Sequence, residues 1–400
     1  MIVSEEFNEK EYAGALDKYA RGYAVINLDA IENNMNSMHD HLAPGTKMLG
    51  VIKTNGYGHG AVEIGKVLEE LDYVFGYAVA TEEEALELRK AGLKKAIIIL
   101  GYTFPYSYKD LALYDIRPAV FRQDSLDELC EAARSAGRKL KVHIKVDTGM
   151  GRIGISPDDE GMKFVKDVLS REDLEIEGVF THFAKADEYD KTSVNKQIAL
   201  FKEFTDRIER ETGYKIPIKH CANSASILEL PDAHMDMVRA GITLYGLMPS
   251  DEVETGEVNL TAVMSLHSHI SYIKTVHAGQ SISYGGLFTA TEDTKVATVP
   301  LGYGDGYPRM LTGKASVLIH GKRCPIIGRI CMDQFMVDVS ALSDVEEGDE
   351  VVLIGRQSNE SVTMEELGNL SGRFNYELAS LINPRVPRIF IREKSIVSVH

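Results

Sequence analysis

Residues 48–60 read Met-Leu-Gly-Val-Ile-Lys-Thr-Asn-Gly-Tyr-Gly-His-Gly, and the interpretation of the chain starts from them. The segment opens with an apolar run of strand length that ends at Lys53. Gly56, Gly58 and Gly60 then allow the backbone to turn sharply and to approach a ligand closely. Beyond them, apolar residues follow the helical spacing i, i+3, i+4, i+7 at Ile64, Val67, Leu68 and Leu71. The pattern predicts a strand, a tight loop and a helix with one buried face.

Lys53 is the first candidate for chemistry. A lysine at the exit of a buried strand is partly removed from water, and desolvation lowers the pKa of its ammonium group. A neutral amine is the form that attacks an aldehyde. A strand-end lysine that simply reaches water is the commoner case, so Lys53 needs the support of the other motifs.

Composition limits the class of protein. The 400 residues exceed what one hydrophobic core usually organises, which predicts two domains. The net charge of −16 opposes binding to nucleic acid or to an anionic membrane as the main activity. No apolar run approaches the ~20 residues that cross a bilayer. Residues 1–10 carry three glutamates and lack the apolar segment of a signal peptide. We therefore expect a cytoplasmic protein.

The cysteines give no sign of a metal site. Cys130, Cys221, Cys324 and Cys331 form no C-x-x-C pair and lie among apolar residues. We predict that they are reduced and packed, with no bound metal.

The first 245 residues alternate short apolar runs with helical patterns. The predicted strands are Met48–Ile52, Tyr73–Val79, Ala96–Leu100, Arg117–Phe121, Lys141–Val146, Leu174–Phe180, Ile216–Cys221 and Met235–Arg239. Between them, Ser125 and Glu128 predict a capping box for a helix that stops at Gly137. Another helix is predicted from about Ser193 to Thr212, with Gly213 past its end. Eight strands, each followed by a helix or long loop, predict an α/β fold with a (β/α)8 TIM-like barrel; a doubly wound open sheet is the alternative.

After Pro249 the pattern changes to short β-rich runs. Asp251 to Glu257 is acidic and contains glycine, as expected for a linker. The runs are His267–Val276, Lys295–Pro300, Ala315–Ile319, Cys324–Ile330, Met336–Val339, Val351–Ile354 and Arg388–Ile391, with one helical segment near Met364–Leu370. They predict a mostly antiparallel β domain. We therefore divide the chain into a barrel domain at residues 1–250 and a β domain at residues 251–400.

The N-terminal segment is open to two interpretations. Tyr23–Leu28 has the pattern of a strand that could belong to the barrel or to the β domain. In the second case the first ~25 residues would pack on the β domain. Asp29–His41 follows with the pattern of a helix.

Polar residues gather where the predicted barrel strands end, which is where barrel active sites are built. They are Lys53 and Tyr57, the segment Lys145–Arg152, His182, Asn223 and Ser224, and the segment Arg239–Ile242. A strand-end histidine alone more often satisfies a neighbour, and a lone arginine more often pairs at the surface. Their occurrence at one rim favours a site. Ser224, Gly241 and Ile242 suit a phosphate, because backbone N–H groups beside a glycine can face an anion.

A lysine and a phosphate site across one barrel mouth suggest pyridoxal 5′-phosphate. A nucleotide cofactor is the alternative from spacing alone. The glycine triplets at residues 56–60 and 302–306 are not G-x-G-x-x-G, and no P-loop occurs, so that alternative is poor.

Nine blocks of this sequence, in order between residues 20 and 392, resemble the bacterial alanine racemases, which are pyridoxal-phosphate enzymes of fold type III. The blocks are Lys53-Thr-Asn-Gly-Tyr-Gly-His-Gly60, Lys145-Val-Asp-Thr-Gly-Met-Gly-Arg152, Thr181-His-Phe-Ala184, Ala222-Asn-Ser-Ala225, Val238-Arg-Ala-Gly-Ile242, Ser283-Tyr-Gly285, Gly302-Tyr-Gly-Asp-Gly-Tyr-Pro-Arg309, Gly328-Arg-Ile-Cys-Met-Asp-Gln334 and Arg385-Val-Pro-Arg388. The resemblance implies a cofactor-binding barrel, a C-terminal β domain, a head-to-tail homodimer and a small amino-acid substrate.

The resemblance also implies residue roles. Lys53 matches the lysine that binds the cofactor covalently and acts as base on one face of the substrate α-carbon. Tyr284, from the partner subunit, matches the base on the other face, and inversion needs one base on each face. His182, linked to Arg239, would help Tyr284 to work near neutral pH, and Arg239 would face the pyridine nitrogen.

The remaining matches line the cofactor and the substrate. Arg152 would hold the cofactor's phenolic oxygen and contact the substrate, and Lys145 matches a lysine that is often carbamylated. The cofactor set adds Tyr57, Asn223, Ser224, Gly241, Ile242 and Tyr376. Met332, also from the partner, would meet the substrate carboxylate beside Tyr303, while Arg309 and Arg329 would support the access channel.

Substrate choice depends on one position. Tyr376 matches a tyrosine that crowds the pocket and is altered in related serine racemases, which favours alanine. A serine or broad-specificity racemase stays open, because a hydrophobic pocket rejects an added hydroxyl only by about 10². Two further activities compete with racemisation, namely a pyridoxal-phosphate decarboxylase and a non-catalytic carrier of the cofactor. The resemblance further implies that D-alanine serves cell-wall synthesis.

The departures from the family pattern are small. Thr54, Gly56 and Gly304 stand where alanines are frequent, and Lys185 adds a charge after the His182 block. None of them removes a chemical group from the expected site.

Overall fold

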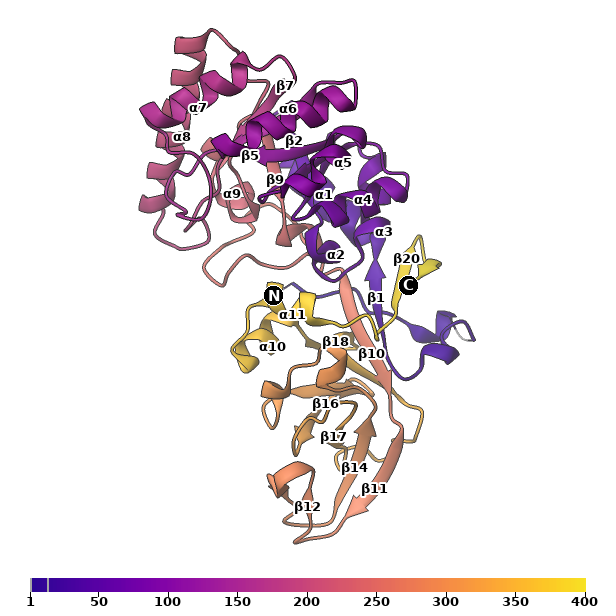
Figure 1. Cartoon of the computed structure of the whole chain (residues 1–400). Helices are drawn as coiled ribbons and strands as arrows, with labels where there is room; N and C mark the ends of the chain where they lie inside the picture. Colours follow the sequence, from indigo (N-terminus) through magenta and orange to yellow (C-terminus); the bar gives the residue numbers. More distant parts are fainter. Residues whose placement is uncertain (1, 13) are drawn as a thin grey trace.

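The computed structural model describes residues 2–12 and 14–400 and contains two large sheets with helices around the first (Figure 1). The strands of the first sheet run in the order β8-β7-β6-β5-β4-β3-β2-β9, and every pair is parallel. Their bounds are β2 (Lys47–Val51), β3 (Val74–Val79), β4 (Ala96–Ile99), β5 (Ile116–Val120), β6 (Leu140–Lys145), β7 (Leu174–Phe180), β8 (Ile218–His220) and β9 (Met237–Ala240).

The first sheet almost closes on itself. The Asp236 amide donates to the Lys219 carbonyl at 3.2 Å, and the Arg239 amide donates to the Ala222 carbonyl at 3.1 Å. These bonds join the ends of the β8 and β9 segments, where no regular ladder forms. The predicted (β/α)8 barrel is therefore confirmed, and the open doubly wound sheet is excluded.

Helices precede or connect the barrel strands along the chain, and most of them cover the barrel from outside (Figure 1). They are α1 (Leu28–Asp40), α2 (Lys53–Tyr57), α3 (Ala61–Glu70), α4 (Glu82–Lys90), α5 (Tyr108–Leu113), α6 (Leu126–Ser135), α7 (Asp159–Ser170), α8 (Thr192–Thr212) and α9 (Ser224–Glu229). The long helix α8 ends where predicted, at Gly213 in the left-handed conformation.

The predicted capping box at α6 is wrong. A 3-10 turn, η4 (Gln123–Ser125), runs directly into α6, so Ser125 already has helical dihedral angles. Its hydroxyl donates back to the Arg122 carbonyl at 2.8 Å, and no side chain caps the helix. A capping box does occur at α4, where Thr81 and Glu84 satisfy each other's backbone amides.

The second sheet follows the order β11-β14-β17-β16-β15-β18-β10-β1-β20-β21, with β19 on β18, and is mostly antiparallel as predicted. Its strands are β1 (Tyr23–Asn27), β10 (Met264–His269), β11 (Tyr272–Val276), β14 (Thr294–Val299), β15 (Ser316–Ile319), β16 (Lys322–Ile327), β17 (Phe335–Asp338), β18 (Glu350–Gln357), β19 (Glu360–Val362), β20 (Arg388–Arg392) and β21 (Ser395–Val399). A small hairpin, β12 (Ser281–Ile282) and β13 (Phe288–Thr289), and the helices α10 (Met364–Ser371) and α11 (Asn375–Leu381) accompany it. None of the helices among the described residues is long and apolar enough to cross a membrane.

The single strand predicted at residues 267–276 is two strands. The Ile270 amide donates to the Asp349 carbonyl, whereas the Ser271 amide donates to the Thr298 carbonyl. The chain thus changes neighbours between these residues, and β10 pairs with β18 while β11 pairs with β14.

The N-terminal strand β1 lies inside the second sheet. It pairs antiparallel with β10 and parallel with β20, and then leads directly into α1. Its Tyr23 is fully buried and stacks on His267 with ring centroids 5.4 Å apart. The chain therefore starts the second sheet, builds the barrel and returns to complete that sheet.

The glycine-rich loop after β2 packs closely against α11 and β20 of the C-terminal part of the chain. A Cβ on Gly58 would lie 2.3 Å from the Ala379 carbonyl oxygen, and one on Gly60 would lie 2.4 Å from the Phe390 ring. Arg388 Nε donates to the Gly58 carbonyl at 3.1 Å. Glycines are needed here because the two parts of the chain approach too closely for any side chain.

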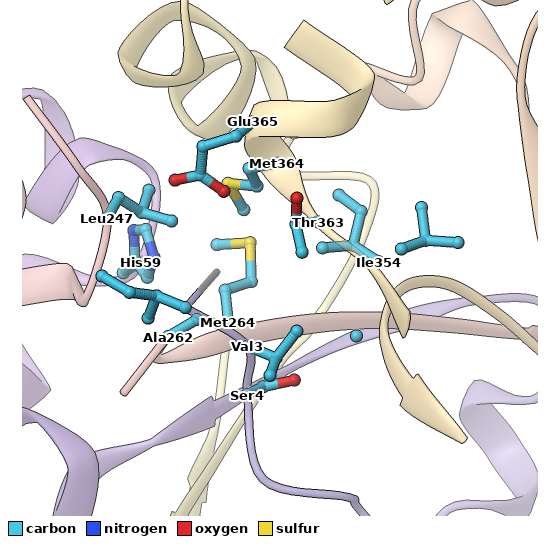
Figure 2. A pocket seen from close by; sticks show the side chains of 13 residues that line it. Val3, Ser4, His59, Leu247, Ala262, Met264, Ile354, Thr363, Met364 and Glu365 are labelled. Atoms are coloured by element: carbon cyan, nitrogen blue, oxygen red, sulfur yellow. The ribbon is translucent and has the colours of Figure 1, made fainter. Parts of the chain in front are cut away.

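His59 points into a small cavity between the same two parts (Figure 2). Figure 2 shows it with Leu247 on one side and Met264, Ile354 and Thr363 on the other. Its Nδ1 lies 3.2 Å and 3.0 Å from the Gly56 and Tyr57 carbonyls, so Nδ1 carries the proton. Burial lowers the pKa of His59 to about 4, so the ring is neutral. Its two hydrogen bonds to the Gly56 and Tyr57 carbonyls hold the glycine-rich loop in place.

Candidate active site

A cavity of about 490 Å³ opens at the carboxyl ends of the barrel strands. It contains all of the predicted rim residues: Lys53, Tyr57, Lys145, Arg152, His182, Asn223, Ser224, Arg239, Gly241, Ile242 and Tyr376. These residues come from separate strand ends of the barrel and from α11, so the barrel and the C-terminal part of the chain together form this cavity.

Lys53 stands at the start of an unusual turn. Thr54, Asn55 and Gly56 all have left-handed dihedral angles, with φ of 54°, 50° and 63°. Left-handed backbone is costly for a β-branched residue such as Thr54 and persists only where its surroundings enforce it. Here the Thr54 amide donates to Glu84 Oε1 at 2.6 Å, and Asn55 Oδ1 accepts from the Ala61 amide at 2.9 Å. The turn fixes the Lys53 backbone at the cavity mouth.

The Lys53 side chain is half-buried in the cavity. Burial, with a further contribution from the nearby Arg152 charge, lowers the pKa of its amine. Among the described residues, no carboxylate lies within ion-pair distance of Lys53. The side chain is thus a cation that the site destabilises.

The loop after β6 holds the arginine of the opposite wall. Asp147 Oδ1 accepts from three backbone amides, those of Gly149, Met150 and Gly151, at 3.0, 2.9 and 3.1 Å. This cluster of bonds sets the course of the loop that carries Arg152 into the cavity.

Lys145 lies beneath that loop and is almost fully buried. Its Nζ donates to the Val146 carbonyl at 2.7 Å and to the Ile153 carbonyl at 3.2 Å. Burial, opposed in part by Asp147, lowers the pKa of Lys145 to about 8.

His182 and Arg239 are bonded to each other at the base of the cavity. Arg239 Nη2 donates to His182 Nδ1 at 3.2 Å and also to the Thr181 and Cys221 carbonyls at 2.9 and 3.0 Å. Burial and the Arg239 charge hold the pKa of His182 well below its usual range, so the imidazole is neutral. Because Nδ1 accepts from Arg239, the proton of His182 is on Nε2.

Ser224 and Gly241 form a recess on another side of the cavity. A Cβ on Gly241 would lie 3.3 Å from Ser224 Oγ and 3.5 Å from the Tyr57 hydroxyl, so the recess depends on a bare backbone. Ser224 Oγ accepts from the Gly241 amide at 3.0 Å. Tyr376 packs near Tyr57, with ring centroids 5.9 Å apart. Hydroxyl and amide groups around a small recess can bind an oxyanion.

The other predicted residues form a separate cluster in the second region. Ser283, next to Tyr284, donates to the Arg329 carbonyl at 2.7 Å, and the Gly304 amide, next to Tyr303, donates to the Met332 carbonyl at 2.8 Å. The side chains are open to solvent: Tyr284 is 71%, Met332 52% and Tyr303 42% exposed. In Figure 1, the hairpin strand β12 before Tyr284 lies at the end of the molecule remote from α2. One chain therefore does not bring Tyr284 to Lys53.

Sequence reasoning missed three residues beneath Arg239. Phe180 stacks on His220 with centroids 4.9 Å apart, and the Arg239 guanidinium lies 5.8 Å from its ring centre. His143 contacts His220 from β6 at 3.0 Å. The available signal was a pair of histidines inside barrel strands, where a buried polar side chain needs a partner.

Comparison with known proteins places these observations in a family. The family model described as the alanine racemase N-terminal domain matches residues 26–249, and that of the C-terminal domain matches residues 263–390. The alanine racemase of Desulforamulus reducens is 43% identical over 92% of this chain and 98% of its own. That of Methanococcus maripaludis is 41% identical over the same shares.

Solved structures give the same result. Alanine racemase from Clostridium difficile 630 superposes with a TM-score of 0.90 at 40% identity, covering 95% of this chain and 98% of that one. The Bacillus anthracis enzyme, solved with bound L-Ala-P, superposes with a TM-score of 0.88 at 37% identity over 96% and 98% of the two chains. With both of its halves matched in sequence and in structure, the chain belongs to the alanine racemase family of enzymes.

Proposed function

We propose that this protein is a pyridoxal-5′-phosphate-dependent racemase that interconverts L- and D-alanine. The observation that carries the proposal is the single cavity in which an amine of lowered pKa, an oxyanion recess and a buried arginine–histidine pair meet. Each feature meets a different demand of that chemistry.

The residues present fit this cofactor. It carries an aldehyde, for which Lys53 supplies the amine, and a phosphate, for which the recess at Ser224, Gly241 and Tyr57 is kept open by the bare glycine. Four basic side chains line the cavity, at Lys53, Lys145, Arg152 and Arg239, against two carboxylates at Asp187 and Glu377, and this excess of basic groups suits a dianionic phosphate. Asn223, Ile242 and Tyr376 complete the proposed binding set.

When bound, the cofactor would withdraw electrons from the substrate α-carbon and so make its hydrogen acidic. The lowered pKa of Lys53 increases the share of neutral amine, which is the form that accepts that proton. Arg239 cannot give up its own proton at this pH, since its pKa is about 10 after lowering by burial. It would therefore hold the cofactor ring nitrogen without protonating it, which favours reprotonation of the α-carbon over side reactions.

The second base must come from elsewhere, and we assign it to Tyr284 of a second copy. The exposure of Tyr284, Met332 and Tyr303 supports this assignment, because large apolar side chains that are open in one chain fit a surface that another copy covers. In the head-to-tail homodimer that we propose, the exposed cluster of each chain closes the cavity of the other. The Nε2 proton of His182 would then be available to stabilise the Tyr284 oxygen.

Alanine is the proposed substrate. Tyr376 stacks on Phe374 with centroids 4.5 Å apart and packs near Tyr57, so it narrows the cavity. We expect slow turnover of serine, because a hydroxyl adds little volume. Equal kcat/KM values for L-alanine and L-serine would contradict the alanine assignment.

The remaining proposals concern modification and setting. A pKa of about 8 leaves part of the Lys145 amine neutral, which is the form that captures CO2 as a carbamate next to Arg152. With ¹³C-bicarbonate, we expect a carbamate carbon signal that the Lys145→Ala variant lacks. We further propose that the reaction takes place in the cytoplasm and provides D-alanine for cell-wall synthesis.

One incubation separates the racemase from the decarboxylase and from the carrier. The holoprotein is mixed with L-alanine in D2O. The proposed racemase exchanges the α-hydrogen and forms D-alanine, a decarboxylase releases CO2, and a carrier does neither. The Tyr284→Phe variant should keep the absorbance of the bound cofactor and lose racemisation.

A further inference from the structure

A continuous chain of hydrogen bonds leads from Arg239 into the interior of the barrel. Arg239 Nη1 lies 3.2 Å from His220 Nδ1, and His220 Nε2 lies 3.0 Å from His143 Nδ1. His143 Nε2 lies 3.2 Å from Glu177 Oε2. All four side chains are buried, and the two histidines are completely so.

The direction of every bond in this chain is fixed by chemistry. A guanidinium can only donate, so His220 must accept on Nδ1 and carry its proton on Nε2. That proton is then donated to His143 Nδ1, which leaves the proton of His143 on Nε2. A carboxylate can only accept, so the chain ends correctly at Glu177. Each bond polarises the next, because all of the donors point the same way.

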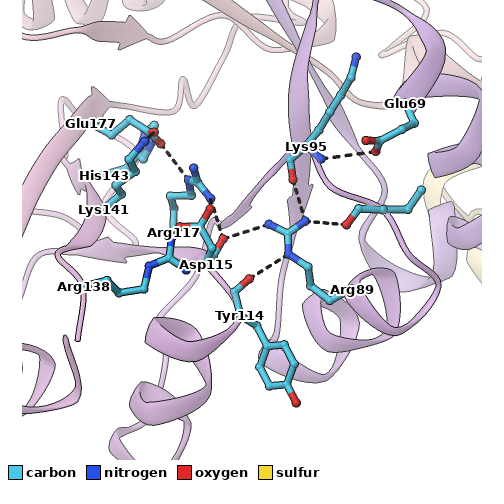
Figure 3. A network of polar contacts seen from close by, with 11 residues as sticks. Glu69, Arg89, Lys95, Tyr114, Asp115, Arg117, Arg138, Lys141, His143 and Glu177 are labelled. Carbon is cyan, nitrogen blue, oxygen red and sulfur yellow. Dashed lines mark hydrogen bonds and ion pairs between the residues drawn. The ribbon is translucent and has the colours of Figure 1, made fainter. Parts of the chain in front are cut away.

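Glu177 is a charged terminus and not a neutral one. It accepts from Arg117 Nε at 3.1 Å, and Lys141 Nζ lies 3.0 Å from its other oxygen. Figure 3 shows Glu177 grouped with His143, Lys141 and Arg117, with Asp115 on the far side of Arg117. Although burial alone would raise it, the bond from His143 and the Arg117 charge hold the pKa of Glu177 well below its usual range.

The backbone aims Glu177 at His143 by a local irregularity. Between β6 and β7, Val142 pairs with Ile176, whereas His143 pairs with Gly178, so Glu177 is an extra residue in β7. Such a bulge redirects a side chain that regular pleating would place elsewhere. Gly178 next to it has no side chain, and a Cβ there would lie 2.4 Å from His143 Nδ1.

Arg239 lacks an anion of its own. It is 4% exposed, and no carboxylate among the described residues lies within ion-pair distance of it. Its partners are the imidazoles of His182 and His220 and three backbone carbonyls. A buried cation without an ion-pair partner is costly, so the hydrogen bonds that hold it must be kept in place. Along its bonded contacts, the carboxylate that it reaches is Glu177.

We propose that Glu177, His143 and His220 are positioning residues: Glu177 fixes which nitrogen of each neutral imidazole carries the proton, and the imidazoles in turn hold the orientation of Arg239. Neither histidine nor Glu177 touches the cavity; they act through Arg239. The catalytic part of the inference rests on the proposed racemase function, whereas the direction of the hydrogen bonds does not.

The direction of the hydrogen bonds is tested on the unmodified holoprotein by ¹⁵N NMR, which shows which nitrogen of each histidine ring carries the proton. We expect His143, His220 and His182 to be neutral with the proton on Nε2. A proton on Nδ1 of His143 or His220, or a doubly protonated ring at neutral pH, overturns the proposal. This result stands whether or not the protein racemises alanine, so it separates failure of the inference from failure of the proposed function.

The contribution of the Glu177 charge is tested with Glu177→Gln, which keeps an accepting oxygen and removes the charge. We expect kcat for alanine to fall about tenfold, equivalent to ~1.4 kcal/mol, with KM unchanged, because the substrate contacts are intact. Asp115→Asn is the matched control. Asp115 Oδ2 accepts from Nη1 of the same Arg117 at 2.8 Å, so this variant also removes a carboxylate from Arg117, but Asp115 is not part of the hydrogen-bond chain to Arg239.

The comparison of the two variants decides between positioning and simple stabilisation. Both are expected to lose some thermal stability, and Glu177→Gln alone is expected to lose kcat. An equal kcat in the two variants would show that Glu177 stabilises the fold without serving Arg239. If Glu177→Gln fails to fold, the ring tautomers of the parent protein still decide the matter.

Discussion

Lys53 and Lys145 share one cavity, and burial lowers the pKa of both amines. What distinguishes them is their bonding. Two backbone carbonyls hold Lys145 Nζ, whereas no carbonyl or carboxylate among the described residues holds Lys53 Nζ. An amine without fixed acceptors can rotate and attack. The structure therefore favours Lys53 as the residue that the cofactor would modify.

This difference predicts the site of attachment. After treatment of the holoprotein with borohydride, peptide mapping should find the reduced cofactor on the peptide that contains Lys53. The Lys53→Ala variant should carry no such label and should lose racemisation by about 10²–10⁴-fold, the usual size of a lost acid–base group. Lys163→Ala, an exposed lysine paired with Glu160 on α7, is the control and should be normal. Label on Lys145 would contradict the assignment.

Lys145 predicts a pH effect on stability. Folding lowers its pKa from 10.5 to about 8, so between these values the folded state releases the proton while the unfolded state keeps it. The free energy of unfolding must therefore gain a contribution as pH rises from about 8 to 10.5 and lack it below pH 8. In CO2-free buffer, denaturant titrations of the parent and of Lys145→Met should diverge in this window. Parallel curves would mean that the lysine is not desolvated.

Most of the rim residues could be predicted because they lie at or just after the end of a barrel strand. His143, Glu177 and His220 could not, since they lie within the strands and only the folded barrel brings them together. The one local mark of the bulge that aims Glu177 is Gly178, a glycine inside a strand. Hydrogen-bond networks in the interior of the barrel are thus harder to predict from the sequence than sites at its rim.

At the level of elements, the barrel strands were predicted closely. Leu174–Phe180 agrees with β7 to the residue, and Met48–Ile52 differs from β2 by one residue at each end. Strands buried on both faces appear as continuous apolar runs, which makes their limits clear. The second sheet was harder, because the hairpin of β12 and β13 is short and the join between β10 and β11 keeps an apolar residue at Ile270.

The glycine-rich loop makes a prediction at this scale. Gly58 combines a φ of +82° with a carbonyl oxygen 2.3 Å from any added Cβ, whereas Gly92 has a φ of +89° and nothing within 4 Å. Gly92→Ala should cost about 1–2 kcal/mol from the left-handed backbone alone. Gly58→Ala should cost about 1–3 kcal/mol more, since the clash is with backbone.

Thermal unfolding of the two apo variants measures this difference, and titration with the cofactor measures its effect on the site. Because the loop positions Lys53 and Tyr57, Gly58→Ala should also weaken cofactor binding, and Gly92→Ala should not. Equal stabilities would mean that the loop can move away from α11 at no cost.

At the scale of the whole molecule, the proposed site needs two chains. Tyr284 and Met332 are exposed in the chain that holds Lys53, and the hairpin before Tyr284 lies remote from α2 (Figure 1). The sequence blocks indicated these residues by resemblance, but no local pattern shows which copy receives them. That information belongs to the assembly.

Subunit mixing tests the shared site. Lys53→Ala and Tyr284→Phe homodimers should each be inactive, because every site lacks one base. In a mixed dimer, one site combines both defects and the other has none. If subunits exchange freely, half of the dimers are mixed, and activity should recover to about a quarter of the parent value. No recovery, with exchange verified by mass spectrometry, would mean that both bases come from one chain.

The place of β1 between β10 and β20 has a consequence for biosynthesis. A ribosome makes Tyr23–Asn27 before either of its neighbours, and the parallel neighbour β20 follows only after the barrel and most of the second sheet. Until β10 is made, this apolar strand has two unpaired edges while the barrel beside it can already form, and one edge stays unpaired until β20 is made. Nascent chains should therefore depend on holding chaperones until both neighbouring strands are made. For the same reason, a split of the gene in the linker after Pro249 would separate an early strand from its sheet, and neither half should be soluble on its own.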